Sequence, residues 1–359
     1  MTTKASSTNR GTKSDPLLID LAFQGGGSHG AFTWGVVERF LDDPTLKIES
    51  ITGTSAGAMN AAVLAYGFTL NGVEGAKAAL EKFWRQVSDA ARFSPMQRAP
   101  LDVMFGNWTL DNSPGYVFYD LASRLFSPYD INPSNLNPLR DVLEESIDFE
   151  RLQQSPIKLF ITATNVRTGL PRVFRNAELN ADALLASACL PLVHQAVEID
   201  GDAYWDGGFS GNPLLTPIIR ESNARDTILV QINPIERPGV PKTARDILNR
   251  LNEIAFNASL KKELRGIAMF QKLLRDEGHL EHVEWVEEWA DMRIHRISTP
   301  MMVELGASSK LNAEWEFLTL LREEGRLQAD NFLRDHRQDL GVRPTFDLST
   351  LLHNLLEQI

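Results

Sequence analysis

The chain has 359 residues, 43% hydrophobic and 23% charged, a composition typical of folded globular proteins. Its formal net charge is −11, so its surface repels phosphate backbones on average, which argues against nucleic acid as a partner. The single cysteine, Cys189, excludes an internal disulfide, and the seven histidines show no zinc-ligand spacing, so no metal site is predicted.

The start of the chain is polar. Residues 1–15 lack the apolar core of a secretory signal, so we expect a disordered tail there. No stretch of the sequence approaches the roughly 18 consecutive apolar residues that span a bilayer. These features predict a cytoplasmic protein and leave open export by a signal-independent route.

The first part of the folded chain alternates strands and helices around two glycine-rich turns. Residues 17–23 form a short apolar run typical of a buried parallel strand, and residues 47–53 predict a second strand. The first turn is formed by residues 25–30, and the residues that follow it carry apolar side chains at helical spacing. Residues 56–67 are apolar nearly all round, as in a helix buried against a sheet. This order predicts an α/β fold with a parallel sheet.

Residues 91–138 interrupt the alternation with many prolines and large apolar side chains. Such a segment fits either a cap or lid that lines an apolar channel, or an ordinary layer of the core. We favour the core interpretation slightly, because the same composition is common in ordinary cores.

Two further buried strands are predicted at 157–165 and 224–234. Between them, alternating apolar residues around Asp200-Gly201 predict a β-hairpin. The chain from 16 to 235 is therefore expected to form one domain, which carries the motifs considered below.

Residues 236–359 are expected to form a mainly helical region that packs on this domain. The expected elements are helices at 243–278 and 311–338, a strand at 293–298 and an amphipathic helix at 347–359. A terminal leucine-rich helix of this kind is more often packed on its own domain than on a membrane or a second copy of the chain.

The strongest functional signal is Gly53-Thr54-Ser55-Ala56-Gly57, between the second strand and the buried helix. Glycines two residues before and after a serine permit the tight turn that exposes a nucleophile, and the helix dipole favours negative charge there. A glycine-rich turn with a serine helix cap would look the same in isolation. The flanking strand and helix favour the nucleophile.

The second signal is the glycine-rich turn after the first strand. The backbone N–H groups of Gly25, Gly26 and Gly27 could form an oxyanion hole for a tetrahedral intermediate. With Gly30, the same turn also satisfies G-x-G-x-x-G, the fingerprint of dinucleotide binding. That fingerprint needs an acidic residue at the end of the second strand, whereas Glu49 lies near its start. We therefore favour the oxyanion hole.

The third signal is Asp206-Gly207-Gly208, just after the predicted hairpin. An aspartate at a strand end can point into a site while glycines turn the backbone away. On its own, this tripeptide would be interpreted as a simple Asp-Gly turn.

Activation of Ser55 requires a base. His194, His279 and His282 lack a compelling local context, although a triad would need one histidine. The alternative is a dyad in which Asp206 accepts the Ser55 proton. A carboxylate needs close contact and partial desolvation to act as such a base.

Together and in this order, the three motifs resemble those of the patatin-like phospholipases, over about residues 17–215. The segment ASACLP at 186–191 is similar to a further block of that family. The resemblance implies a three-layer α/β/α fold with a mostly parallel central sheet, here followed by the helical C-terminal extension.

The resemblance also implies the chemistry, which is hydrolysis of acyl esters of phospholipids or related lipids through an acyl-enzyme intermediate. It implies a Ser55–Asp206 dyad without a catalytic histidine, metal or organic cofactor, and an oxyanion hole at Gly25, Gly26 and Gly27. The implied supporting glycines of the motifs are Gly53, Gly57, Gly207 and Gly208.

One residue departs from the family pattern. The family usually has arginine or lysine where this chain has His29, and a histidine is mostly neutral at pH 7. The charge of the preferred lipid head group is therefore left open. His29 fits a substrate contact or a loop histidine bonded to backbone.

Several functions stay open beside a phospholipase A or lysophospholipase. The same dyad would serve an intracellular polyhydroxyalkanoate depolymerase or a general carboxylesterase. The glycine turn leaves a dinucleotide-binding oxidoreductase as a weaker alternative, and a non-catalytic scaffold is weaker still. The expected partner is a lipid or other ester substrate, with transient contact to a membrane or lipid granule. The sequence gives no oligomeric state.

Overall fold

The computed structural model describes residues 15–277, 288–289 and 291–349. The predicted tail therefore lies outside the described residues except for Asp15, as does most of the helix predicted at 347–359. None of the described helices is long and apolar enough to cross a bilayer.

The centre of the molecule is an eight-stranded sheet with the order β5-β6-β3-β2-β1-β7-β8, and β4 pairs beside β3. The strands are β1 (Leu17–Phe23), β2 (Leu46–Thr54), β3 (Lys158–Asn165), β4 (Pro171–Arg175), β5 (Val197–Ile199), β6 (Asp202–Asp206), β7 (Asp226–Val230) and β8 (Arg293–Ile297). The five strands β3, β2, β1, β7 and β8 run parallel. β4 and β6 pair antiparallel with β3, and β5 pairs antiparallel with β6.

The predicted strands and the hairpin are confirmed. Asp200 and Gly201 both have positive φ, 53° and 84°, as a tight hairpin turn requires. The sequence analysis missed β4, because this strand begins with a proline, carries two arginines and has Phe174 as its one fully buried side chain.

Helices cover both faces of the sheet, which gives the expected three layers. One face is covered by α1 (Gly30–Leu41), α2 (Ala56–Ala91), α6 (Pro138–Ser146), α7 (Phe149–Gln153), α8 (Ala181–Ser187) and α13 (Trp315–His336). The other is covered by α9 (Thr216–Glu221) and α10 (Ala244–Glu277). The helices predicted after the two glycine turns and at 243–278 and 311–338 correspond to α1, α2, α10 and α13 and are confirmed.

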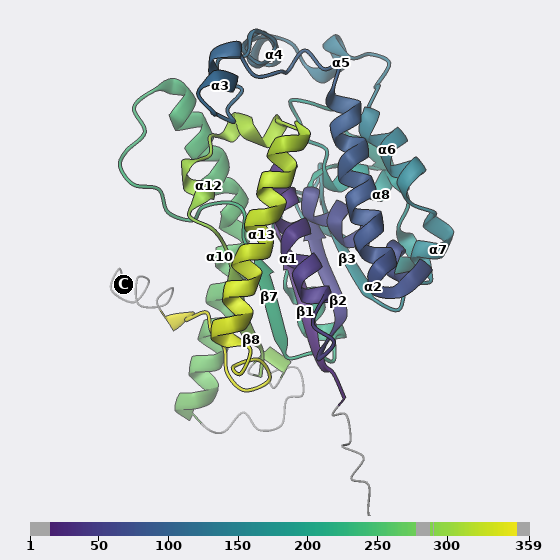
Figure 1. Ribbon diagram of the computed structural model, residues 1–359, viewed down its shortest axis with the longest axis vertical. Helices are drawn as coiled ribbons and strands as arrows, with labels where there is room; N and C mark the ends of the chain where they lie inside the picture. Colours follow the sequence, from purple (N-terminus) through teal and green to yellow (C-terminus); the bar gives the residue numbers. More distant parts are fainter. Residues whose placement is uncertain (1–14, 278–287, 290, 350–359) are drawn as a thin grey trace, which may run out of the picture.

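The C-terminal region shares a hydrophobic core with the part of the chain before residue 236. β8 extends the sheet beside β7, and α13 lies along α1 (Figure 1). The two helices approach closely at two glycines, where a side chain on Gly35 would overlap the carbonyl oxygen of Arg322 and one on Gly325 that of Phe32.

Residues 91–138 form a cap of short helices, α3 (Pro100–Met104), α4 (Pro114–Leu125) and α5 (Pro128–Ile131). They follow one another along one end of the molecule, at the top of Figure 1, and β1 runs from the bottom towards that end. Most large apolar side chains of the cap are exposed, for example Phe105 at 70% and Phe118 at 74%. The favoured core interpretation is therefore wrong for most of this segment, although Leu110 is fully buried.

Candidate active site

The register of the sheet brings the ends of two strands together. Thr54, the last residue of β2, pairs with Thr162 of β3. Asp206, the last residue of the antiparallel β6, pairs with the neighbouring Ala163. Ser55 and Asp206, which are far apart in the sequence, therefore lie beside the same point of β3.

Ser55 occupies a strained turn between β2 and α2. Its φ of 54° and ψ of −123° lie in a region that residues with a side chain rarely adopt. A Cβ on Gly53 would come within 2.7 Å of the Gly57 carbonyl oxygen, and one on Gly57 would overlap the Phe23 carbonyl oxygen. Both flanking positions of the motif thus require glycine, and Ser55 is held at the start of α2.

Ser187, in the ASACLP segment, fixes the backbone of this turn. The Ser55 N–H donates to Ser187 Oγ at 2.9 Å, and the Ser187 hydroxyl donates to the Thr162 carbonyl at 2.7 Å. The sequence analysis noted the segment and assigned no role to its serine.

Asp206 is buried, with 1% of its surface exposed. Its Oδ1 accepts the Gly208 N–H at 2.7 Å, while its Oδ2 has no hydrogen-bond partner among the described residues. Burial raises the pKa of Asp206 from 3.8 to about 6, although the Gly208 N–H, the Ser55 hydroxyl and the charge of Lys310 oppose the shift. The Ser55 hydroxyl is thus near this carboxylate, and Oδ2 is free to accept a proton.

Gly207 and Gly208 allow the backbone to turn within a crowded space. A Cβ on Gly207 would overlap the Thr162 carbonyl oxygen, and one on Gly208 would overlap the ring of Phe256. The two glycines therefore let Asp206 end its strand directly beside β3.

The glycine loop after β1 lies against the nucleophile, because a Cβ on Gly25 would come within 2.7 Å of the Ser55 Cβ. The prediction for this loop needs a correction at Gly25, whose N–H already donates to Asn212 Oδ1 at 2.7 Å. The N–H groups of Gly26 and Gly27 have no acceptor among the described residues. These two remain available to an oxyanion.

A buried network of polar side chains, which the sequence analysis missed, holds this loop. Gln24 Oε1 accepts the N–H of Asn233 at 2.9 Å, and Gln24 Nε2 donates to Asn257 Oδ1 at 3.1 Å. Asn233 Nδ2 in turn donates to the Gly25 carbonyl at 2.7 Å. Gln24 precedes the glycine motif directly, whereas no sequence signal marks Asn233 or Asn257.

His29 does not face a substrate. It is 2% exposed and its Nε2 lies 2.8 Å from Ser309 Oγ, whose hydroxyl donates to the Gly306 carbonyl, so Nε2–H is the donor to Ser309. Burial, with the charges of Lys310 and Arg237, lowers the pKa of His29 well below 6.5, so it is neutral. Both interpretations of His29 are therefore wrong, and it anchors the glycine loop to a C-terminal side chain.

No described histidine hydrogen-bonds to Ser55 or Asp206. His194 lies between α8 and β5, and its buried Nδ1 has no partner among the described residues. His279 and His282 lie outside the described residues.

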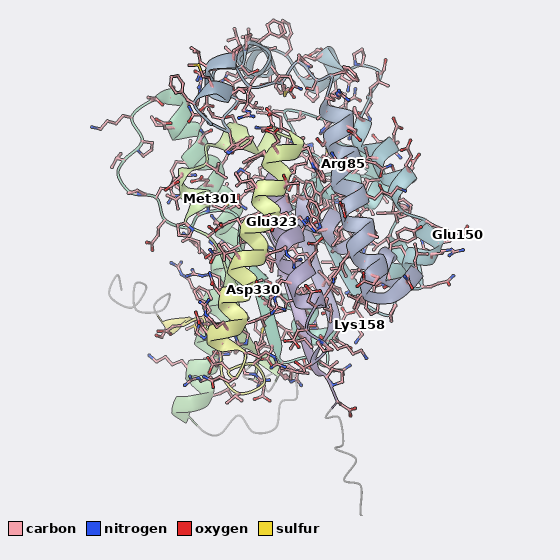
Figure 2. All side chains as sticks on the ribbon, viewed as in Figure 1. Arg85, Glu150, Lys158, Met301, Glu323 and Asp330 are labelled. Carbon is pink, nitrogen blue, oxygen red and sulfur yellow. The ribbon has the colours of Figure 1, made fainter. Side chains whose placement is uncertain are left out.

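Glu49 lies at the end of the sheet away from the glycine loop. It pairs with Lys158 Nζ at 2.9 Å, and Figure 2 shows Lys158 at the lower end of the molecule, far from the cap. Glu49, the acidic residue that the dinucleotide alternative would use, therefore lies far from the loop.

The region that carries these residues is similar to a known family. The family model described as patatin-like phospholipase matches residues 21–219. VipD from Legionella pneumophila is 13% identical, over 87% of this chain and 67% of that one, with a TM-score of 0.35. A chain of the heterodimeric ExoU–SpcU complex from the type III secretion system of Pseudomonas aeruginosa is 17% identical, over 96% and 76%, with a TM-score of 0.29. No curated protein matches the chain.

Proposed function

This chain belongs to the patatin-like phospholipase family, a family of lipid acyl hydrolases, and on that premise we propose that it cleaves carboxylic esters of phospholipids through Ser55 and Asp206. One observation carries the assignment of the residues. Ser55 sits in a strained, glycine-flanked turn beside a buried carboxylate, one oxygen of which has no partner among the described residues.

In the first half of the reaction, Asp206 Oδ2 accepts the proton of the Ser55 hydroxyl while Oγ attacks the ester carbonyl carbon. The N–H groups of Gly26 and Gly27 donate to the oxyanion of the tetrahedral intermediate. The N–H of Ala56 joins them, because the first residue of a helix has no acceptor within the helix. Asp206 then returns the proton to the leaving oxygen, which departs as the alcohol product, and the acyl group stays on Ser55.

In the second half, Asp206 accepts a proton from water, and the hydroxide attacks the acyl carbonyl. The second tetrahedral intermediate uses the same donors. Collapse releases the fatty acid and returns the proton from Asp206 to Ser55 Oγ. No redox step is involved, and Asp206 ends each half in the ionised state in which it began.

The apolar side chains that the cap exposes support a lipid as the substrate, because they form a surface on which a lipid can dock. We define the apolar collar as Leu101, Met104, Phe105, Val117, Phe118, Leu121, Leu125, Phe126 and Tyr129, all exposed. α4 has no buried residue, and Val117, Leu121 and Leu125 follow one another at four-residue spacing on one unpartnered stripe. A large exposed apolar patch, such as this collar, marks a docking site.

The cap is attached on both sides of the candidate site. On one side, Thr109 Oγ1 lies 2.9 Å from Ser308 Oγ, beside the residues that hold the glycine loop. On the other, Gln195 Nε2 donates to the Asn132 carbonyl at 2.7 Å, in the segment that leads to β6. Because the whole chain carries a net charge of −11, the collar is best suited to a zwitterionic lipid surface rather than an anionic one. Such a surface would present the substrate to Ser55.

The test is a substrate panel with release of the acid product as the readout. It comprises phosphatidylcholine vesicles, lysophosphatidylcholine, a triacylglycerol emulsion, polyhydroxybutyrate granules and 4-nitrophenyl butyrate. We expect fatty acid from the phospholipids, and a rate at least about 10³-fold lower for Ser55→Ala. Activity on the granules alone would reassign the enzyme as a polyester depolymerase, and activity on the soluble ester alone as a general carboxylesterase.

The collar is tested separately with the double variant Phe105→Ser/Phe118→Ser. We expect weaker sedimentation with phosphatidylcholine vesicles and unchanged hydrolysis of 4-nitrophenyl butyrate. Val342→Ser is the matched control, because Val342 is 73% exposed but follows α13, away from the cap. Equal vesicle binding by all three proteins would show that the collar does not dock on lipid.

A further inference from the structure

Lys310 contacts the glycine loop from two sides. It lies in the 3-10 helix η4 (Ala307–Leu311), outside the residues matched by the family model. Its carbonyl oxygen occupies the space that a Cβ on Gly27 would fill. Its Nζ donates to Asn233 Oδ1 at 2.7 Å, and Asn233 Nδ2 donates to the Gly25 carbonyl. The C-terminal region thus grips both ends of the Gly25–Gly27 segment through one residue.

Lys310 also carries a positive charge that acts on the candidate base, Asp206. His29, inside the loop, is neutral. Arg237 is held by Glu253 at 2.7 Å, so its charge is largely compensated. Within the described part of the chain, Lys310 Nζ has no carboxylate within 4.0 Å, and its hydrogen bond goes to a neutral amide. Its positive charge therefore acts on Asp206 and favours the ionised form of that carboxyl.

We propose that Lys310 is a positioning residue of the active site, whose ammonium holds the glycine loop through Asn233 and keeps Asp206 ionised for its role as base. The proposal rests on the proposed function. It assigns to a C-terminal residue the positive charge that the glycine loop itself lacks.

The charged and titratable groups around these two residues are few. Lys310 faces Glu253, Arg237, Asp206 and the neutral His29, and burial, the strongest influence, lowers the pKa of Lys310 from 10.5 to about 8. Asp206 faces the Ser55 hydroxyl, the Gly208 N–H and Lys310, with the buried Cys189 thiol nearby. Asp206 is ionised above about pH 6 and Lys310 protonated below about pH 8, so both charges coexist between these values.

The experiment measures kcat/KM for 4-nitrophenyl butyrate from pH 5 to pH 10 in the wild type, Lys310→Met and Lys310→Arg. We expect a bell-shaped wild-type profile. Lys310→Met should lose at least about tenfold at its maximum and shift the acid limb to higher pH, because Asp206 loses a stabilising cation. Lys310→Arg should stay within a few-fold of the wild type and lose the basic limb, because a guanidinium does not titrate in this range.

Lys262→Met is the control, since Lys262 is exposed on α10 and should leave the profile unchanged. If Lys310→Met does not fold, as judged by its thermal transition, the basic limb of Lys310→Arg carries the test. Profiles of folded Lys310 variants that match the wild type in both limbs would overturn the proposal. Failure of the wild type to cleave any ester, or full activity of Ser55→Ala, would instead overturn the proposed function.

Discussion

The two halves of the central sheet hold buried aspartates that differ in their hydrogen bonds. At the end where β6 and β2 stop, Asp206 Oδ2 has no hydrogen-bond partner within the part of the chain that the structure describes. In the other half of the sheet, Asp20 Oδ1 accepts hydroxyl donors from Ser50 at 2.5 Å and Ser222 at 2.7 Å. Asp226, at the start of β7, accepts from His295, Arg293 and the Gly341 N–H.

The comparison separates a desolvated carboxylate from a candidate catalytic one. Burial raises the pKa of both Asp20 and Asp206 to about 6, so the shift alone does not distinguish them. What differs is the capacity for further hydrogen bonds. Thr162 Oγ1, on β3, and Asn212 Nδ2, whose amide oxygen accepts the Gly25 N–H, are also buried without a partner among the described residues. Unused hydrogen-bonding capacity beside a strained serine is what marks the reactive end.

The largest expected effect is that of Asp206→Asn, which should lower kcat by about 10³-fold or more because the base is removed. It should not lower stability, since ionising this desolvated carboxyl opposes folding at pH 7. Urea unfolding and steady-state kinetics measure the two quantities.

Asp226→Asn is the matched variant at the other end. Burial opposes ionisation of Asp226, but His295 and Arg293 lower its pKa from 3.8 to about 2. Its contribution of about 2 kcal/mol is therefore present above pH 4 and lost as the pH falls towards 2. We expect reduced stability with kcat unchanged. A folded Asp226→Asn protein as inactive as Asp206→Asn would remove the distinction between the two ends.

Next in size is the effect of Gly27→Ala, for which we expect a loss of about 100-fold in kcat. The added Cβ would overlap the Lys310 carbonyl, and the φ of 58° is unfavourable for alanine. The displaced loop no longer presents its N–H groups to the oxyanion. Gly266→Ala is the control, because no atom lies within 4 Å of its added Cβ. Equal kcat values for the two variants would contradict an oxyanion role for the loop.

A smaller effect is expected for Ser187→Ala, about tenfold in kcat, since one hydrogen bond that fixes the Ser55 backbone is lost. Ser50→Ala, which removes a donor to Asp20, should lower stability by about 1 kcal/mol and leave kcat unchanged. Kinetics at saturating substrate, with thermal unfolding of both variants, make the comparison. A lower kcat for Ser50→Ala with an unchanged kcat for Ser187→Ala would show that the turn at Ser55 does not depend on Ser187.

The smallest effect is a shift of pH dependence. The acid limb of kcat/KM should have its midpoint near pH 6, where Asp206 becomes protonated. Asp20 titrates in the same range, but its raised pKa means that its stabilising contribution is complete below about pH 4 and lost as the pH rises through 6. Asp20→Asn should therefore flatten the change of stability between pH 4 and 6 and leave the acid limb in place. Movement of the limb in this variant would mean that Asp206 is not the group observed.

The features predictable from sequence are those set by local spacing. Apolar runs marked the parallel strands, because a strand buried on both faces is apolar throughout. The pentapeptide around Ser55 is informative because glycine is sterically required at both flanking positions. Asp206 was predicted as the base through the resemblance of the three motifs to a family, because its Asp-Gly-Gly tripeptide alone indicates only a turn.

The features that escaped prediction depend on tertiary contacts. Asn233 and Lys310 reach the glycine loop from distant segments with no recognisable motif. The occupied N–H of Gly25 depends on the placement of Asn212. The exposure of Phe105 and Phe118 could not be read from composition, since buried and exposed apolar segments share the same residues.

The most direct test of the central claim is the site of covalent labelling by a fluorophosphonate, which reacts with activated serines. Peptide mass spectrometry of the labelled wild type should place the adduct on Ser55. Ser55→Ala should show no adduct, and labelling of Asp206→Asn should be strongly slowed. An adduct on another serine, or none under conditions in which a known serine hydrolase is fully labelled, would contradict the account.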